Sequence, residues 1–436
     1  MSLIVDLGHF HRSCSHASDR LMKILSATPF LIVLLILIAQ PLVAQQVETQ
    51  QWAQWRGPQG DGTAGDQKPV TTWSDSSNVI WKTKVPGKGH SSPIVTEKKI
   101  FLTTSNQGEG TQSVLCFDRD SGELIWTKRV NQGELPKIHQ KNTHASPSVA
   151  IHGDLVFALF HNHGEQKLTA LNSDGDVIWE KSLGAYKSLY PFGVGGSPIV
   201  YGDLLIAPHE NETSSKIFGL EAATGKKVWT ARRQHTNYST PVVATVGGKD
   251  QMLISGQSSV TSFNPTDGKK NWSVPAQWKV TCGTVVWDQE RVYASGGYPV
   301  QQTIAVSSDG SKQVWDAPIK AYEQSMIVVG DHLYSLSDRG VIYCFVAATG
   351  KVAWKSRFEG PVSASPIFAN GNLFFTAESG KTIVVKADPT EFKIVATNQL
   401  GTDAFASFAL VDNKIITRVG DDSAGEYQEW LYCLGQ

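Results

Sequence analysis

The chain has 436 residues, a formal net charge of −1 and an ordinary balance of hydrophobic and charged residues. This length exceeds one average domain, and the charge excludes the basic surface of a nucleic-acid-binding protein and a long acidic tail. The 13 Trp and 39 Gly residues, without long stretches of helical periodicity after the N-terminus, favour many short strands joined by turns.

The N-terminus reads as a targeting segment. Residues 29–44, PFLIVLLILIAQPLVA, form an apolar run that ends in small residues and is followed by the polar QQVETQQ. The run is shorter than a comfortable membrane span. We therefore predict that residues 1–45 are a signal peptide, with an uncleaved anchor as the alternative. Met22-Lys23 sits where a signal would begin, so residues 1–21 are expected to be an over-extended start. The mature chain would be periplasmic or secreted, with no stable membrane span.

A short motif recurs along the rest of the chain. Its copies are DRDSGELIW (118–126), NSDGDVIW (172–179), EAATGKKVW (221–229), NPTDGKKNW (264–272), SSDGSKQVW (307–315) and VAATGKVAW (346–354). A seventh copy, DPTEFKIV (388–395), has lost both Gly and Trp. The Trp residues recur every 39–53 positions, which suits a repeat of four strands with their loops.

A second landmark marks the start of each unit. It reads SSPIV (91–95), ASPSV (145–149), GSPIV (196–200), STPVV (239–243) and ASPIF (364–368), with divergent versions CGTVV (282–286), QSMIVV (324–329) and ASFALV (406–411). Eight starts and four strands per unit predict an all-β, eight-bladed β-propeller of four-stranded antiparallel blades.

The two ends of the repeat region complement each other. The last unit supplies KIITRV (414–419) and EWLYCL (429–434) and then stops one strand short. The segment NVIWKTKV (78–85) has the signature of the missing outer strand but no partner strands before it. Pairing the two removes both free edges and closes the ring. We therefore predict a propeller over residues 78–436 and an irregular lead-in over residues 46–77.

The motif itself has a structural interpretation. A Thr-Gly-Lys or Asp-Gly-Lys turn between strands needs Gly at a positive φ. The Trp then lies on the outermost strand, where it can pack on a neighbouring blade and donate its N–H to a main-chain acceptor. We predict inter-blade docking, not ligand contact, for these residues: Trp81, Trp126, Trp179, Trp229, Trp272, Trp315 and Trp354.

These copies resemble the tryptophan-docking repeats of the pyrroloquinoline quinone (PQQ)-like β-propellers. The resemblance covers about Val79 to Cys433. That superfamily contains quinoprotein dehydrogenases and the propeller lipoprotein of the outer-membrane assembly machinery, so it implies the fold and leaves enzyme and scaffold open. For an enzyme it implies a quinone between an indole and an adjacent-Cys disulfide, with Ca²⁺ and an Asp base. The sequence has no Cys-Cys pair and no CxxCH.

Polar and aromatic residues cluster in the loops expected at one mouth of the channel. The candidate ligand-binding residues are His90, His139, His144, Tyr190, His209, His235, Tyr238, Trp278, Lys279, Tyr322, Glu323 and Asp403. A simply solvated channel is the alternative, and His161 with His163 or His209 with Glu210 could instead contribute to a metal site. In the enzyme interpretation, Trp278 would stack on the quinone, and Glu210 and Asn211 would bind Ca²⁺.

The cysteines also repeat. Cys116 and Cys344 each precede a turn Gly by six residues, and Cys433 looks equivalent, so these side chains would enter separate cores. We favour buried free thiols over disulfides.

The sequence contains no GxSxG, HExxH or P-loop motif. We therefore predict an exported, non-catalytic scaffold that binds an envelope or secreted protein, a peptide or a small ligand, and no nucleic acid. The alternative is a PQQ- and Ca²⁺-dependent dehydrogenase that oxidises an alcohol or a sugar.

Overall fold

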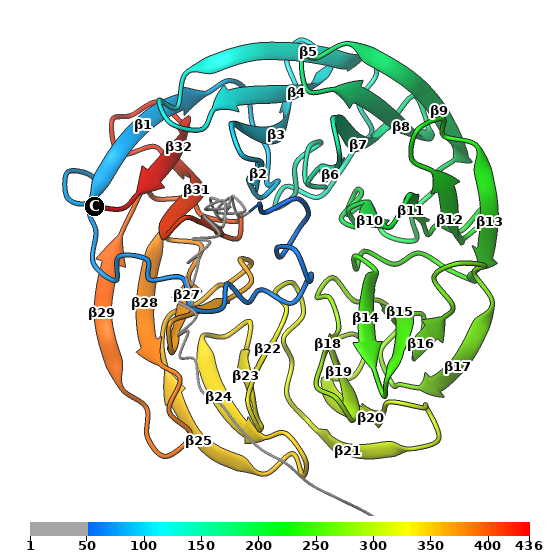
Figure 1. The fold of residues 1–436 in the computed structure, drawn as a ribbon, viewed down its shortest axis with the longest axis vertical. Helices are drawn as coiled ribbons and strands as arrows, with labels where there is room; N and C mark the ends of the chain where they lie inside the picture. Colours follow the sequence, from blue (N-terminus) through cyan, green and yellow to red (C-terminus); the bar gives the residue numbers. More distant parts are fainter. Residues whose placement is uncertain (1–50) are drawn as a thin grey trace, which may run out of the picture. The chain divides into compact units, whose positions relative to one another are not determined.

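The structure, a computed structural model, describes residues 51–436, which form 32 strands and no helix. The strands make eight four-stranded antiparallel sheets arranged as blades around a ring (Figure 1). The predicted eight-bladed propeller is confirmed. The predicted signal peptide and residues 46–50 of the lead-in lie outside the described residues. Within the described range, no helix is long and apolar enough to cross a membrane.

The first four blades follow one another along the chain, each running from an inner to an outer strand. Blade 1 contains β2 (Ile94–Val95), β3 (Lys99–Asn106), β4 (Thr111–Asp118) and β5 (Leu124–Gln132). Blade 2 contains β6 (Ala150–His152), β7 (Leu155–Asn162), β8 (Glu165–Asn172) and β9 (Val177–Ala185). Blade 3 contains β10 (Ile199–Tyr201), β11 (Leu204–His209), β12 (Lys216–Glu221) and β13 (Lys227–Arg232). Blade 4 contains β14 (Val242–Val246), β15 (Lys249–Gly256), β16 (Ser259–Phe263) and β17 (Lys270–Pro275).

The next three blades repeat this order, and the eighth combines both ends of the propeller. Blade 5 contains β18 (Val286–Trp287), β19 (Arg291–Gly296), β20 (Gln302–Ser307) and β21 (Gln313–Ala317). Blade 6 contains β22 (Ile327–Val329), β23 (His332–Leu336), β24 (Val341–Val346) and β25 (Val352–Arg357). Blade 7 contains β26 (Ile367–Ala369), β27 (Asn372–Thr376), β28 (Lys381–Lys386) and β29 (Ile394–Gln399). Blade 8 contains β30 (Ala409–Val411), β31 (Lys414–Asp421), β32 (Gln428–Leu434) and β1 (Val79–Val85).

The ring closes as predicted. β1 is the outer strand of blade 8 and pairs antiparallel with β32, from Val79 opposite Leu434 to Val85 opposite Glu429. Figure 1 shows the N-terminal β1 beside the C-terminal β32. This pairing covers the open edge of β32 and joins the two ends of the propeller without a covalent link.

The motif Gly and the motif Trp meet across blade seams. Gly225 has a φ of +67°. A Cβ at Gly225 would lie 2.8 Å from the ring of Trp179, which belongs to the preceding blade. The same relation joins Gly268 to Trp229 and Gly350 to Trp315, each at 2.5 Å. The glycine thus adopts the turn conformation, and its lack of a side chain lets the neighbouring indole pack directly against it.

Most of these indoles also donate their N–H to a carbonyl oxygen of the next blade. The acceptors are Arg119 for Trp81, Ser173 for Trp126, Ala222 for Trp179, Ala347 for Trp315 and Asp388 for Trp354, at 2.8–3.2 Å. Trp272 differs, because its N–H reaches the side chain of Gln251 within its own blade. Trp229 has no acceptor for its N–H among residues 51–436.

A ring of hydroxyl groups links the blades where the inner strands begin. This hydroxyl belt consists of Ser92, Ser148, Ser197, Thr240, Thr284, Ser325, Ser365 and Ser407. In seven of the eight seams a backbone N–H donates to the hydroxyl of the next blade at 2.9–3.0 Å. Between blades 4 and 5 the hydroxyl of Thr284 instead donates to the carbonyl of Thr240 at 3.3 Å.

The belt corrects the alignment of one landmark. In ASPSV (145–149) the Ser-Pro pair suggests that Ser146 matches Ser197 of GSPIV. The structure places Ser148 in the belt instead, because Ser148, not Ser146, hydrogen-bonds to Ser197. The Ser-Pro pair of this copy lies two residues upstream, in the preceding loop.

The lead-in crosses the central channel, as the blue segment in Figure 1 shows. Trp52 pairs with Val95 at the far end of the blade 1 inner strand, and the carbonyl of Ala53 accepts the N–H of Ile151 in blade 2. Further along, Ala64 donates to the carbonyl of Phe368 in blade 7. All these bonds lie beyond the hydroxyl belt, so the lead-in occupies one end of the channel.

The lead-in also supplies an indole at the seam where the motif has none. Ala396 takes the register position that Trp354 holds in the blade before. Trp73 packs at this seam, 6.3 Å from the ring of Phe374 and 6.1 Å from that of Phe408. Its backbone N–H donates to Asn398. The lead-in thereby packs a tryptophan between blades 7 and 8.

Candidate functional site

The channel holds a cavity of about 370 Å³ at the mouth formed by the loops that precede the inner strands. Every blade contributes to it. The lining residues are Trp55, His90, Ser92, His139, Lys141, Asn142, Ser146, Phe192, Gly195, Ser197, Tyr238, Thr240, Cys282, Tyr322, Glu323, Ser363, Phe405 and Ser407. Four belt hydroxyls are among them, and Trp55 extends into the cavity from the lead-in. The cavity thus lies between the lead-in and the mouth.

Aromatic rings form much of the wall. The rings of His90 and Phe405 stack with centroids 4.1 Å apart and planes 5° from parallel. On another side Phe192 lies 5.7 Å from Tyr238 and 5.6 Å from His139. These faces can pack against an apolar or planar group.

His90 is a neutral imidazole. Burial lowers its pKa to about 3, and the positive charges of Arg418, Lys88 and Lys141 act in the same direction. Its Nε2 is buried and has no hydrogen-bond partner among residues 51–436. The ring lines the cavity, whereas this nitrogen is enclosed by protein atoms.

An ion pair spans the mouth. Lys141 Nζ lies 2.8 Å from Glu323 Oε2 and 2.7 Å from Glu378 Oε1. The hydroxyl of Ser363 contacts the same two oxygens at 2.5 and 2.6 Å. Burial opposes the charge of Lys141, but its hydrogen bonds to the two carboxylates outweigh burial and raise its pKa. Lys141 is therefore held as an ammonium.

The rim of the mouth exposes large apolar side chains. Leu189, Tyr298 and Val300 are 47%, 50% and 41% exposed. Tyr298 lies 5.9 Å from Tyr190, which in turn lies 5.4 Å from the cavity residue Phe192. Exposed apolar side chains next to a cavity are typical of a surface that binds a partner.

Five of the twelve predicted site residues line the cavity: His90, His139, Tyr238, Tyr322 and Glu323. Tyr190 lies at the rim. The other six lie elsewhere in the mouth loops or in the core. Sequence reasoning did not select Lys141, Glu378, Ser363, Phe405 or Trp55, although Lys141 lies between His139 and His144 in a loop already of interest.

Four of those six residues are at or near the surface. His144 Nε2 lies 2.8 Å from the carbonyl of Pro136, and His235 is exposed beside Glu212. Lys279 is exposed, and Asp403 accepts a hydrogen bond from Tyr427. None of the four lines the cavity.

Trp278 and His209 differ more from the prediction, because both are fully buried. Trp278 packs in the hydrophobic core shared by blades 4 and 5. Side chains alternate in this extended segment, so that Lys279 faces solvent while Trp278 and Val280 face inward. His209 Nδ1 lies 2.7 Å from Gln166 Oε1.

The four cysteines of residues 51–436 are free. Cys116, Cys344 and Cys433 are buried, each opposite a docking tryptophan in the strand register. Cys282 lines the cavity, and burial raises the pKa of its thiol. It is therefore held as a thiol with little nucleophilic character.

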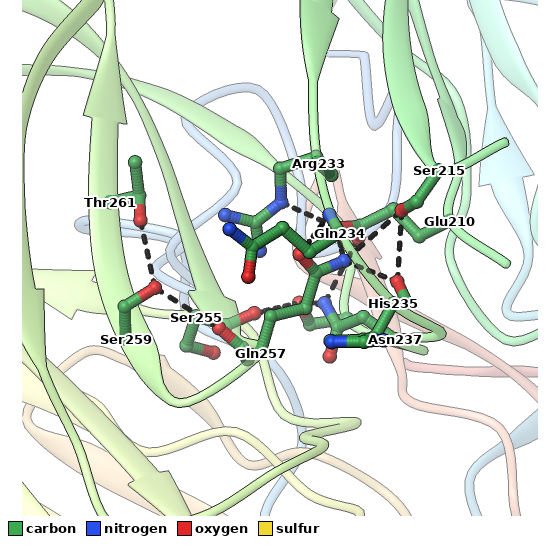
Figure 2. Close-up of polar contacts among 12 residues, drawn as sticks. Glu210, Ser215, Arg233, Gln234, His235, Asn237, Ser255, Gln257, Ser259 and Thr261 are labelled. Atoms are coloured by element: carbon green, nitrogen blue, oxygen red, sulfur yellow. Dashed lines mark hydrogen bonds and ion pairs between the residues drawn. The ribbon is translucent and has the colours of Figure 1, made fainter. Parts of the chain in front are cut away.

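Glu210 is enclosed by its own partners, as Figure 2 shows. Its Oε1 accepts hydrogen bonds from Arg233 Nε at 2.6 Å and Gln257 Nε2 at 2.9 Å. Its Oε2 accepts one from Asn237 Nδ2 at 3.0 Å. The buried charge is paired and its oxygens are satisfied, so the network fastens blade 3 to blade 4.

This network bears on the quinone cofactor that the resemblance implies. A Ca²⁺ ligand needs free carboxylate or amide oxygens, and those of Glu210 are taken. Asn211 Oδ1 accepts the backbone N–H groups of Thr213 and Ser214 and caps its own turn. Trp278, the candidate stacking surface, is buried away from the cavity. The residues therefore do not fit PQQ with Ca²⁺ in the way the sequence suggested.

The suggested metal pairs do not converge either. His163 Nε2 lies 3.1 Å from the carbonyl of Gln132, while the ring of His161 packs 4.8 Å from that of Tyr186. Across residues 51–436, no three His, Cys, Asp or Glu side chains are placed to hold a metal ion.

Comparison with known proteins agrees with this architecture. Residues 63–189, 111–356 and 300–391 match the sequence family described as outer membrane protein assembly factor BamB. The protein of that name from Burkholderia pseudomallei is 24% identical over 253 residues. This alignment covers 54% of the chain and 59% of the relative, so it spans less than two thirds of the relative's length.

Solved structures share the fold. BamB from Moraxella catarrhalis superimposes with a TM-score of 0.57 at 16% identity, over 81% of this chain and 96% of that one. Quinohemoprotein alcohol dehydrogenase from Comamonas testosteroni gives 0.64 at 10% identity, over 89% and 81%. At these identities the likeness extends to the propeller and not to its ligands.

Proposed function

The chain belongs to the family of outer membrane protein assembly factor BamB, and from this we propose that it is an exported scaffold that binds a protein or peptide at its cavity-bearing mouth. The role is non-catalytic. Export is supported by the apolar residues 29–44, and a place in the cell envelope by the name of the Burkholderia relative.

One observation carries the binding role: exposed apolar side chains and a cavity adjoin on the same face. Leu189, Tyr298 and Val300 would provide apolar contact area, and the cavity behind them would receive a projecting side chain. Interfaces of this kind concentrate their binding energy in an anchor residue that fills a pocket.

The experiment is site-specific photo-crosslinking in the native cell. A benzophenone amino acid would replace Leu189 or Val300 at the mouth, and Val228 or Lys249 as controls. Val228 is exposed on an outer strand and Lys249 lies on the turn side of blade 4. We expect a discrete crosslinked product from the mouth positions alone, and its loss when Tyr298→Glu is added.

Equal products from mouth and control positions, or none from the mouth, would contradict the proposal. Purified protein with the mutation Tyr298→Glu should keep the wild-type melting temperature, since the side chain is half exposed. This control separates loss of binding from loss of fold.

The dehydrogenase alternative has its own test. Purified protein would be titrated with PQQ and Ca²⁺ while the thermal midpoint is followed, because a ligand that binds only the native state raises that midpoint. We expect no increase, since Glu210 and Asn211 are engaged. An increase together with alcohol-dependent dye reduction would favour the enzyme.

A further inference from the structure

The ion pair at the mouth joins opposite sides of the ring. Lys141 belongs to the loop before β6, and Glu323 to the loop before β22; these strands face each other across the channel (Figure 1). Glu378 comes from the turn between β27 and β28 in blade 7. Lys141 and Glu323 both line the cavity, so a ligand in the cavity would lie beside their ion pair.

The two carboxylates need a cation. Ser363 carries one hydroxyl proton and can donate it to only one of them, so the other depends on the ammonium of Lys141. Two carboxylates this close repel each other strongly unless a positive charge lies between them. No cation other than Lys141 forms an ion pair with either carboxylate in the part of the chain that the structure describes.

We propose that Glu323 and Glu378 are the binding site for a cationic group of the ligand, an ammonium or a guanidinium, and that Lys141 occupies this site until the ligand displaces it. The inference rests on the proposed binding function of this mouth and names the chemistry that the mouth selects. A ligand that removes Lys141 without supplying a positive charge would leave both carboxylates uncompensated.

The surroundings favour the same ligand class. His90 is neutral and adds no positive charge to the cavity. Tyr322 already has a cation over its face, because Lys320 Nζ lies 5.0 Å from the ring centroid. Aromatic faces beside carboxylates bind an alkyl ammonium or guanidinium well.

The cavity defines the rest of the ligand. Its volume of about 370 Å³ is lined by Glu323 and by aromatic rings, and Glu378 contacts the lining residues Lys141 and Ser363. A ligand that places an apolar or aromatic group in the cavity and a cationic group at the mouth uses both features. A peptide with a basic residue next to an aromatic one has this form, and a free aromatic amine shares its chemistry.

Lys141 can leave its site without movement of its loop. The backbone N–H of His139 donates to the carbonyl of Pro191 at 2.5 Å, and the side chain of Asn142 bonds to the carbonyl of Phe192. These contacts fix the loop on either side of Lys141. Its flexible four-carbon stem is then the moving part.

The test measures binding of two dipeptides by calorimetry: acetyl-Trp-Lys-amide and acetyl-Trp-norleucine-amide, which has a similar stem without the charge. Phenethylamine is the free-amine probe. The variants are Lys141→Met, the double variant Glu323→Gln/Glu378→Gln, and Lys137→Met as a control on an exposed lysine of the same loop. Melting temperatures establish that each variant is folded.

We expect wild-type protein to prefer the lysine dipeptide. The mutation Lys141→Met should tighten its binding by about tenfold, because the internal competitor is gone. The double variant should lose the preference for lysine over norleucine, and Lys137→Met should leave it unchanged. Phenethylamine binding as tightly as the dipeptide supports a free amine as ligand, and weaker binding supports a peptide.

A second measurement follows Lys141 itself. Acetylation of its amine, quantified by mass spectrometry, should rise when acetyl-Trp-Lys-amide is added and not when the norleucine peptide is added.

Equal affinity for the two dipeptides, weaker lysine-dipeptide binding in Lys141→Met, or no binding of either dipeptide to any variant would overturn the inference. The proposed scaffold function would stand in each case if crosslinking from Leu189 still succeeds. If dipeptide binding and crosslinking from Leu189 both fail, the proposed scaffold function is overturned as well.

Discussion

Three histidines near the mouth are kept neutral by their surroundings. Burial lowers the pKa of His209 to about 4, with smaller contributions from Lys216 and His161, and it lowers the pKa of His161 to about 4 and that of His90 to about 3. An ordinary histidine titrates near 6.5. Between these values the unfolded chain binds protons that the folded protein does not.

This difference predicts acid sensitivity. The neutral histidines make their full contribution to the unfolding free energy above about pH 6.5. This contribution is lost as the pH falls toward about 4, because protonation then favours the unfolded chain. The mutation His209→Gln should remove roughly 2–3 kcal/mol of that pH-dependent loss. Urea unfolding at pH 7 and pH 4.5 measures it. An identical pH dependence in mutant and wild type would contradict a neutral His209.

Individual residues of the cavity were predictable only where their position follows from the nearby repeat sequence. His90, His139, Tyr238, Tyr322 and Glu323 precede inner strands, and the repeat places those positions at the mouth. Lys141 could not be predicted, because its partners are about 180 and 240 residues away in the sequence and no local pattern indicates a contact across the channel. The choice between inward Trp278 and outward Lys279 depends on strand phase in an irregular loop.

At the scale of elements, the hairpin turns have two tasks. Gly225 provides a positive φ and also the space for Trp179, whereas Gly202 has a φ of +54° with nothing within 4 Å of an added Cβ. A substitution at Gly202 therefore tests backbone strain alone, whereas a substitution at Gly225 tests backbone strain and packing together.

The mutation Gly202→Ala should cost roughly 1 kcal/mol of unfolding free energy for the left-handed conformation alone. Gly225→Ala should cost roughly 1–3 kcal/mol more, because the new methyl group would clash with the indole of the blade before. Denaturant unfolding of both variants measures the difference. Equal losses of unfolding free energy in the two variants would show that packing of the indole does not require glycine at this position.

The strands themselves were largely readable from the sequence, because Gly turns, apolar alternation and Trp spacing all favour the same hairpins. The exception is instructive. In ASPSV the Ser-Pro pair precedes the belt position by two residues, so local similarity misled where an inter-blade hydrogen bond decides the register.

The whole molecule depends on the lead-in as well as on its blades. Residues 51–77 carry no regular strand, yet they contact inner strands around the ring and place Trp73 at the seam without a motif tryptophan. A structural role for this segment could not be predicted from the sequence, because the segment matches no repeat.

Replacing Trp73 by Ala should destabilise the protein by about 3–5 kcal/mol, since a buried indole would be removed from the seam between blades 7 and 8. Hydrogen exchange should quicken in β26–β31 before it does in blades 2–4. Trp55→Ala, in the same lead-in but lining the cavity, is the matched control and should cost much less. Equal losses from the two substitutions would refute a seam-specific role.

The hydroxyl belt has a consequence for how such rings change in size. In seven of its eight seams the donor is the N–H of one blade and the acceptor is the hydroxyl of the next, always in the same rotational sense. Each blade therefore carries one half of two different links. The N–H and the hydroxyl of a belt residue belong to the same residue, so duplication or loss of a complete blade with such links on both sides leaves each remaining N–H facing a hydroxyl. Gene rearrangements that respect the inner-strand serine can thus alter the number of blades without opening the circuit of hydrogen bonds.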